Sequence, residues 1–293
     1  MSTTNKERRK KLFDAAEALR AREKPTEKGF RVVVTGKGGA GKTTLTALLA
    51  KLFAQKGFNV LAVDEDPQIN LPYSLGISPE SEIIAVSRNL DYVEEKTGAR
   101  PGEGWGAMLR LNPDVSDVVD RFGIRTADGI NLLVMGSVVQ AATGCLCPEN
   151  ALLEAIVNMI SLRDGEVVLM DTQAGVEHFG RALARGFRQA VVITEPTFNA
   201  FQVARHAARL SRQLGIEHVH LVLNKVRSEE DVERFRKLAG SDLDLFDALF
   251  ILPYDEKVLA VEPDVTALLQ QESPYVSEVS KLLDTLVAFG ATA

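Results

Sequence analysis

The chain has 293 residues, a length that fits one large domain or two modest ones. Apolar residues make up 45% and charged residues 25%, which is enough apolar material to bury a core. The 34 Lys and Arg residues against 40 Asp and Glu residues give a formal net charge of −6, which argues against a nucleic-acid binder with a general basic surface. No apolar run approaches the ~18 residues of a membrane-spanning helix, and the charged N-terminus lacks the apolar core of a secretory signal. We therefore expect a cytoplasmic protein without stable membrane insertion.

Residues 1–29 differ from the rest of the chain and are predicted to form a basic helical N-terminal extension. The segment is rich in Lys and Arg, and its apolar residues between positions 12 and 19 fall at helical spacing. Charged terminal segments usually form a solvated or loosely docked helix, and docking onto an acidic partner or a membrane surface is the alternative. Residues 30–293 are expected to form the main domain.

From Phe30 onward, short apolar runs alternate with stretches of helical periodicity. Runs rich in Val, Ile and Leu without clean alternation are typical of strands buried on both faces of a parallel sheet. The predicted strands are 31–35, 60–63, 131–135, 167–170, 190–194, 219–223 and 249–252, and the predicted helices are 42–56, 149–162, 176–186, 198–214, 229–238 and 277–288. This order predicts an α/β fold with a doubly wound, mostly parallel sheet. Residues from about 76 to 130 break the rhythm and are predicted to be a loop-and-helix insertion.

Residues 36–43 match the phosphate-binding pattern G-x-x-x-x-G-K-S/T in full, between a predicted strand and a predicted helix. The glycines let backbone N–H groups converge on phosphate oxygens, and the helix N-terminus adds positive potential. Lys42 is expected to neutralise the β- and γ-phosphates of ATP, and Thr43 is expected to offer its hydroxyl to Mg²⁺. The predicted nucleotide-binding residues of this loop are Gly38, Gly39, Ala40, Gly41, Lys42, Thr43 and Thr44.

Lys37 is a second lysine inside the same loop. The sequence GKGGAGKTT resembles the deviant Walker A group of P-loop ATPases, the SIMIBI or MinD-like type, which includes MinD, ParA, the nitrogenase iron protein, ArsA-type pumps and metal-insertion ATPases. The resemblance implies that ATP or ADP is sandwiched in a homodimer. It also implies that Lys37 reaches across the interface to the partner's nucleotide and acts in catalysis together with Lys42.

Carboxylates that close the strands lie beside the P-loop in this architecture. By the same resemblance, Asp66 is the catalytic residue that orients the attacking water, and Asp64 lies nearer the P-loop and the metal shell. Asp171 closes a later strand and resembles the Walker B aspartate, which holds the Mg²⁺ shell. Asn224 and Lys225, after the sixth predicted strand, resemble the adenine-reading position, and Pro253 lies in a segment that resembles the one closing over the base.

Both cysteines lie in the segment GCLCPEN, too few for a disulfide framework. A closed soft-metal site usually takes four ligands, which a two-fold dimer would supply from Cys145 and Cys147 of each chain. Thiolates suit Zn²⁺ in tetrahedral geometry or Ni²⁺ in square-planar geometry. Buried, redox-inert thiols are the alternative. A disulfide is disfavoured, because the short spacing strains the bridge and the expected compartment is reducing.

Several segments occur in an order that resembles CooC-type ATPases, the accessory proteins that insert nickel into carbon monoxide dehydrogenase. They are GKGGAGKTT, VDEDP, TGARPGEGWGAMLRLNPDVSDVVDRFG, DGINLLVMG, GCLCPENALL and MDTQAGVEHFGR. The resemblance implies an ATP-dependent metallochaperone whose Cys145 and Cys147 bind nickel or zinc at a dimer interface. Thr172 and Gln173 stand where the family pattern has Met and Glu, so the related acetyl-CoA synthase is a second expected client.

Two other functions within the wider group stay open. A MinD- or ParA-like positioning ATPase shares the P-loop, but the C-terminal helix 277–288 has Lys281 as its one cation, which makes it a poor membrane anchor. A reductase like the nitrogenase iron protein would hold a 4Fe–4S cluster, with cysteines typically far apart in sequence. The close spacing of Cys145 and Cys147 disfavours that cluster.

Overall fold

The structure is a computed structural model that describes residues 28–98, 115, 117–136, 155–156, 162–173 and 186–291. The predicted N-terminal extension lies outside these residues, apart from 28 and 29. The predicted helices 149–162 and 176–186 also lie almost entirely outside them.

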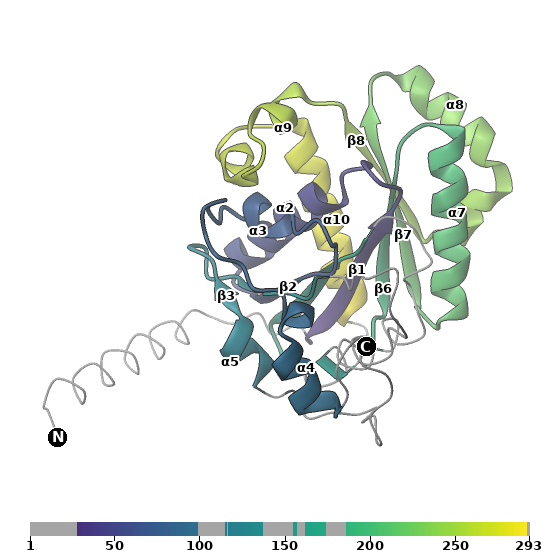
Figure 1. Ribbon diagram of the computed structural model, residues 1–293. Coiled ribbons are helices and arrows are strands. Elements are labelled where there is room, and N and C mark those ends of the chain that lie inside the picture. Colours follow the sequence, from purple (N-terminus) through teal and green to yellow (C-terminus); the bar gives the residue numbers. More distant parts are fainter. Residues whose placement is uncertain are drawn as a thin grey trace, which may run out of the picture.

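The described residues form an eight-stranded sheet with the order β3-β4-β2-β5-β1-β6-β7-β8 (Figure 1). Neighbouring strands are parallel except β3 and β4, which are antiparallel. The strands are β1 (Phe30–Gly36), β2 (Asn59–Asp64), β3 (Ile124–Arg125), β4 (Asn131–Val134), β5 (Glu166–Asp171), β6 (Gln189–Thr194), β7 (His218–Val226) and β8 (Ala248–Pro253). The seven predicted strands are confirmed with small shifts at their ends. The short strand β3 is an addition, because two residues carry no periodicity.

Helices cover both faces of the sheet, so the strands are buried on both sides (Figure 1). The helices are α2 (Lys42–Gln55), α3 (Leu71–Ser74), α4 (Leu90–Thr97), α5 (Val118–Phe122), α7 (Phe198–Gln213), α8 (Glu229–Ala239), α9 (Glu256–Ala260) and α10 (Pro274–Ala291), with 3₁₀ turns η1 (Val86–Arg88), η2 (Gly240–Leu245) and η3 (Val265–Gln270). Helices α2 and α10 pack on one face, and α4, α5, α7 and α8 pack on the other. Within β1, Val32 and Val34 pack on the face covered by α2 and α10, and Val33 packs on the opposite face. Both faces of the strand are therefore apolar, which explains why its sequence does not alternate between apolar and polar residues.

The predicted insertion at about 76–130 contains η1, α4, α5 and β3 in its described part. Tyr92 of α4 is fully buried, and its hydroxyl donates a hydrogen bond to Asp117 Oδ1 at 3.1 Å. The guanidinium of Arg121 lies 4.6 Å from the centre of the Tyr92 ring and pairs with Asp117 and Glu95. These contacts join α4 to α5. Tyr92 and Val118 also belong to one buried cluster with Val63 and Leu133 of the sheet, so this described part packs onto the main core.

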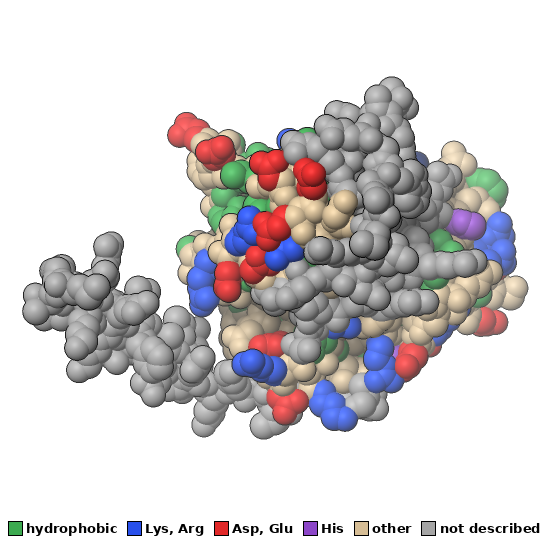
Figure 2. All heavy atoms as spheres, turned by 60° about the horizontal axis from the view of Figure 1, so that its bottom comes forward, with side chains coloured by type: hydrophobic (Ala, Val, Ile, Leu, Met, Phe, Trp, Pro, Cys, Tyr) green, Lys and Arg blue, Asp and Glu red, His purple; other side chains and the backbone are tan. Residues whose placement is uncertain are grey.

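The parallel arrangement brings the C-terminal ends of β1, β2, β5, β6 and β7 to one edge of the sheet. The loop after β1 leads directly into α2 at that edge, where ligands of open α/β sheets bind. Among the described residues, none of the helices has the length and apolar character needed to cross a membrane. On the described part of the face in Figure 2, acidic and basic side chains lie intermixed.

Candidate functional site

The loop between β1 and α2 shapes the floor of the site. Gly41 immediately precedes α2 and has a φ of 100°, in the left-handed region that glycine adopts without strain. A Cβ atom at Gly41 would lie 2.6 Å from Asn224 Nδ2, so a larger residue would clash there. Because α2 begins at the next residue, its free N–H groups and the positive end of its dipole face the loop. The loop is therefore built to receive an anion.

Lys42 is the first residue of α2 and is 6% exposed. Its Nζ atom donates a hydrogen bond to the carbonyl oxygen of Lys37 at 3.4 Å. Burial lowers the pKa of Lys42, while the nearby carboxylates of Asp171 and Asp66 act in the opposite direction. The ammonium thus lies inside the loop, where its hydrogen bond to the carbonyl oxygen is long. A phosphate oxygen in the loop would accept a stronger, charge-assisted hydrogen bond from it.

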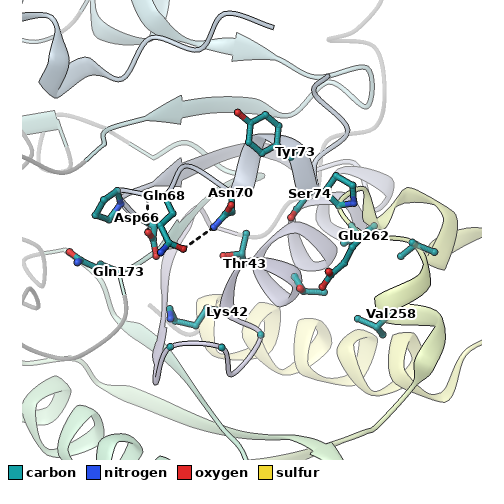
Figure 3. A pocket seen from close by; sticks show the side chains of 18 residues that line it. Lys42, Thr43, Asp66, Gln68, Asn70, Tyr73, Ser74, Gln173, Val258 and Glu262 are labelled. Carbon is teal, nitrogen blue, oxygen red and sulfur yellow. Dashed lines mark hydrogen bonds between the residues drawn. The ribbon is translucent and has the colours of Figure 1, made fainter. Parts of the chain in front are cut away.

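A cavity of about 620 Å³ opens at the loop, a size that suits a small-molecule ligand. In Figure 3, the side chains of Lys42, Thr43 and Asp66 surround one space, and Glu262 reaches toward it from the opposite side. The cavity is further lined by Gly38, Gly39, Gly41, Thr44, Pro67, Gln68, Asn70, Tyr73, Ser74, Gln173, Val258, Val261, Pro263 and Val265.

Asp64 ends β2 and is fully buried beside Asp171, its register partner at the end of β5. The Asp64 carboxylate accepts hydrogen bonds from the backbone N–H groups of Asp66 at 2.9 Å and Leu71 at 3.1 Å. Burial, reinforced by the charge of Asp171, raises the pKa of Asp64 to about 8. Asp64 therefore fixes the turn that presents Asp66, and its place in the metal shell stays a prediction.

Asp171 is also buried, and its carboxylate oxygens have no hydrogen-bond partner among the described residues. Burial raises the pKa of Asp171 to about 7, while nearby Thr43 and Lys42 act to lower it. An unpartnered buried carboxylate is costly unless a ligand completes its contacts. Mg²⁺ prefers oxygen ligands and takes one or two carboxylates beside phosphate oxygens and waters. Asp171 and Thr43 therefore fit an Mg²⁺ ion that arrives with a nucleotide.

Asp66 is half-buried and lines the cavity. Its Oδ1 atom accepts a hydrogen bond from the backbone N–H of Gln68 at 2.9 Å, and Gln68 Oε1 accepts one from Asn70 Nδ2 at 3.5 Å (Figure 3). These bonds hold the carboxylate at the rim of the cavity that Lys42 also lines. Orientation of a water by Asp66 is compatible with this position and remains a prediction.

A second cavity of about 120 Å³ adjoins the first at the P-loop and contains both positions predicted to contact adenine. Asn224 lies within β7 rather than after the strand, because β7 continues past an irregularity to Val226. Its Nδ2 atom donates a hydrogen bond to the carbonyl oxygen of Ala40 at 2.8 Å, so Asn224 holds the P-loop itself. Pro253 ends β8 and lines the same cavity. The adenine contacts of Asn224 and Pro253 stay predictions.

Sequence reasoning missed several residues of the two cavities. Gln173 lines the first cavity and follows Asp171, the last residue of β5, by two positions. Extending the search for polar residues two positions past the end of the strand would have found it. Val258 and Glu262 line both cavities from α9 and the segment after it. No local pattern marks these two residues, because only the return of the chain from β8 over the P-loop brings them there. Lys225, which the sequence singled out together with Asn224, also lines the second cavity.

The predicted soft-metal ligands Cys145 and Cys147 lie outside the described residues. Within the ranges that the structure describes, no group of three or more His, Cys, Asp or Glu side chains is arranged to hold a metal ion. The Ni²⁺ or Zn²⁺ site therefore stays a prediction. Lys37 is half-buried, and its carbonyl oxygen accepts hydrogen bonds from Lys42 Nζ and from the backbone N–H of Ala40 at 3.2 Å. The action of its side chain across a dimer also stays a prediction.

Comparison with known families accounts for this arrangement. Residues 31–264 match the CobQ/CobB/MinD/ParA nucleotide binding domain. The chain belongs to this family. As a family member with a complete P-loop site, it is a nucleotide-binding P-loop ATPase, which confirms the prediction for the enzyme class and for the nucleotide.

Curated relatives narrow the position within the family. The chain is 37% identical over 235 residues to the carbon monoxide dehydrogenase accessory protein CooC of Rhodospirillum rubrum, an alignment that covers 80% of the chain and 87% of CooC. It is 35% identical over 258 residues to an uncharacterized ATP-binding protein of Methanocaldococcus jannaschii, with 88% of the chain and 98% of that protein covered. The predicted resemblance to CooC-type ATPases is confirmed.

Solved structures of the family confirm the predicted fold. The MinD cell division protein of Aquifex aeolicus matches with a TM-score of 0.59 at 21% identity, covering 88% of the chain and 97% of that structure. The MinD protein of Pyrococcus horikoshii, solved in complex with Mg-ADP, matches with a TM-score of 0.58 at 18% identity, covering 90% of the chain and all of that structure. Identities this low establish the shared fold alone.

Proposed function

We propose that this chain is an ATP-dependent metallochaperone that binds nickel and assists its insertion into carbon monoxide dehydrogenase or the related acetyl-CoA synthase. The observation that carries the proposal is the 37% identity to a carbon monoxide dehydrogenase accessory protein over 87% of that protein's length. The GCLCPEN segment adds a chemical reason, because it supplies two thiol ligands to a family whose fold otherwise provides the nucleotide site. The proposed place of action is the cytoplasm.

Hydrolysis of ATP would be carried out by the residues around the first cavity. Lys42 and the backbone N–H groups of the P-loop would stabilise the charge on the β- and γ-phosphates. Asp66 would orient the attacking water at the rim of the cavity. Mg²⁺ held by Thr43 and Asp171 would neutralise further phosphate charge. Positioning and charge stabilisation are the main contributions a protein makes to phosphoryl transfer, and this site provides both.

Dimerisation would link the nucleotide to the metal. Lys37 would contact the nucleotide of the partner, so ATP would stabilise the association of two chains. The same association would bring Cys145 and Cys147 of both chains together as four thiolate ligands. Each binding event would then lower the association cost of the other, and hydrolysis would loosen the metal for transfer.

The test is a transfer assay with purified, nickel-free carbon monoxide dehydrogenase. The chain is loaded with Ni²⁺, mixed with the client with or without ATP, and separated, and the nickel in the client is measured. We expect ATP-dependent transfer from the parent chain and no transfer from Cys145→Ser/Cys147→Ser. Transfer that is equal for the parent and this double variant would contradict the proposal.

A MinD-like positioning role is the second candidate, since several MinD proteins are relatives, including one of Synechocystis at 27% identity over 238 residues. Membrane anchoring through the C-terminal helix is disfavoured by packing. Val279, Leu282, Leu283 and Leu286 of α10 are fully buried against the core and are not available to lipid. Sedimentation of the chain with anionic vesicles in the presence of ATP would support this role.

An iron–sulfur reductase is the remaining alternative. A visible absorption band near 400 nm after anaerobic purification would indicate it.

A further inference from the structure

Two consecutive residues of β7 hold two consecutive carbonyl groups of the P-loop. Asn224 Nδ2 donates a hydrogen bond to the oxygen of Ala40 at 2.8 Å, and Lys225 Nζ donates one to the oxygen of Gly39 at 2.7 Å. The backbone N–H of Lys225 in turn donates to Asn224 Oδ1 at 2.8 Å. The two side chains therefore act from one strand on the same loop, and the hydrolysis described above leaves Lys225 without a role.

Lys225 takes a backbone conformation that residues with a Cβ atom disfavour. Its φ is 61°, in the left-handed region, and a register shift between Leu223 and Val226 interrupts the pairing of β7 with β8 at this point. Irregularities of this kind redirect a side chain, and strained conformations persist where surrounding contacts hold them. Here the irregularity coincides with the contact between the Lys225 ammonium and the P-loop.

Glu195 holds the same ammonium from a second strand. It directly follows β6, and its Oε1 atom lies 2.6 Å from Lys225 Nζ. The side chains of Lys225 and Glu195 are 44% and 25% exposed, so the ion pair by itself adds little to stability. Its main effect is geometric, because the carboxylate and the Gly39 carbonyl together fix where the ammonium lies.

The contact at Gly39 orients the turn that carries Lys37. A peptide group is planar and trans, so a Gly39 carbonyl directed at Lys225 sends the N–H of Ala40 the opposite way. That N–H donates to the carbonyl oxygen of Lys37 at 3.2 Å and closes the turn 37–40. The same Lys37 oxygen also accepts the hydrogen bond from Lys42 Nζ. The chain of contacts thus runs from Glu195 to the lysine that receives the phosphates.

We propose that Lys225 and Glu195 form a positioning pair that keeps the P-loop turn 37–40 in its phosphate-binding conformation. The pair contacts the backbone of the loop, and its effect on a nucleotide is therefore indirect. A loop that is already ordered loses less conformational freedom on binding, so removing the pair should weaken ligands that fill the loop. ADP places its β-phosphate there, whereas AMP has no β-phosphate. The pair should therefore matter for ADP and hardly at all for AMP.

The test is calorimetric titration of ADP with Mg²⁺ and of AMP into the parent, Lys225→Met and Lys225→Asn. Asn tolerates the left-handed conformation but is too short to reach Gly39, so it removes the ammonium without backbone strain. We expect ADP affinity to fall about 10-fold in both variants and AMP affinity to change less than about twofold. Lys281→Met removes another ion-paired lysine, on α10, and is the matched control, expected to leave both affinities unchanged.

Glu195→Gln tests the other half of the pair, and we expect it to weaken ADP binding about threefold. It also keeps the proposal testable if a Lys225 variant fails to fold. Unchanged ADP affinity in the folded variants would overturn the proposal. Equal losses of ADP and AMP affinity would overturn it too, since they would assign Lys225 to the second cavity, which it also lines. These titrations need neither nickel nor hydrolysis, so their outcome is independent of the metallochaperone proposal.

Discussion

At the scale of single residues, the proposed hydrolysis assigns nucleotide binding and water orientation to two different side chains of one cavity. Lys42 is buried at the start of α2 inside the loop, and Asp66 lies half-buried at the rim of the same cavity. Asp64 and Asp171 are both buried and pair with each other at the ends of the neighbouring strands β2 and β5. Binding and turnover should therefore respond differently to substitutions at Lys42 and Asp66.

The residue-scale prediction compares Lys42→Ala with Asp66→Asn. Loss of the buried ammonium should weaken ADP binding about 100-fold or more, because the phosphates lose their main charge-assisted partner. Asp66→Asn keeps the oxygen that accepts the hydrogen bond from Gln68, so ADP affinity should stay within about threefold while turnover falls about 100-fold. Titration calorimetry and phosphate release measure the two effects.

Asp164→Asn is the matched control for the carboxylate, since Asp164 is exposed in the turn before β5. It should leave both binding and turnover unchanged. If Asp66→Asn hydrolyses ATP at the parent's rate, Asp66 has no role in orienting water.

At the scale of elements, a buried network ties β7 to β6 and α10. His220 of β7 is fully buried, its Nε2 atom lies 3.4 Å from Gln189 Oε1, and Gln189 Nε2 donates to the carbonyl oxygen of Leu286 at 2.9 Å. Aromatic rings of Phe250 and Phe289 flank the imidazole. Burial lowers the pKa of His220 to about 4, so the folded protein keeps the imidazole neutral where the unfolded chain would protonate it.

This network predicts a loss of stability in mild acid. A depressed folded pKa means that the unfolded state binds the extra proton first, so stability is fully present above pH 6.5 and falls as the pH decreases to about 4. Within that window His220 should contribute a loss of about 1.4 kcal/mol per pH unit. Urea unfolding of the parent and of His220→Gln at several pH values isolates this contribution, because the buried carboxylates are common to both.

The expected outcome is a free energy of unfolding that falls more steeply with acid in the parent than in His220→Gln. Parallel pH profiles for the two proteins would mean that His220 is not held neutral by burial.

Element types were largely predictable from the sequence, whereas contacts between distant elements were not. The Val- and Leu-rich run of β1 followed by the P-loop glycines marks both a strand and a site, because each signal is local. Lys51 shows the opposite case. It occupies an ordinary helical position in α2, yet it is buried and donates to Leu75 O at 3.2 Å and to Asp128 Oδ2 at 2.5 Å, 77 residues away.

The residues of the candidate site also fall into two groups, those that a sequence signal marks and those that only the tertiary structure places there. The P-loop motif singled out Lys42 and Thr43, a strand end singled out Asp171, and the family resemblance singled out Asp66; all four line or adjoin the first cavity, and their roles stay predictions. The roles of Asn224 and Lys225 on the P-loop depend on an irregularity in β7 that no local pattern indicates. Residues of α9 line the cavities because the chain returns over the P-loop after β8. Tertiary packing decides that path, and no local sequence pattern indicates it.

At the scale of the whole molecule, the proposed activity requires two chains. Lys37 lies in the P-loop turn, and its carbonyl oxygen accepts the contacts that order the loop within one chain. The proposal gives its side chain a different task, contact with the partner's nucleotide. This assignment predicts that binding within one chain and association of two chains can be separated by substitution.

We expect Lys37→Ala to bind ATP within about threefold of the parent's affinity but to form no ATP-stabilised dimer, since the lost group acts across the interface. Light scattering with size-exclusion chromatography, with and without ATP, measures the association. A Lys37→Ala dimer as stable and as active as that of the parent would show that the lysine does not act in trans.

The nickel stoichiometry tests the central claim most directly, because the chain provides two thiols and the proposed site needs four. Equilibrium dialysis of Ni²⁺ in the presence of a non-hydrolysable ATP analogue, followed by metal analysis and sizing, gives the number of ions per chain. We predict one tightly bound Ni²⁺ per dimer in the parent and none in Cys145→Ser/Cys147→Ser, with affinity falling in acid as the thiolates protonate. One ion per monomer irrespective of dimerisation, or undiminished binding by the double variant, would contradict the account.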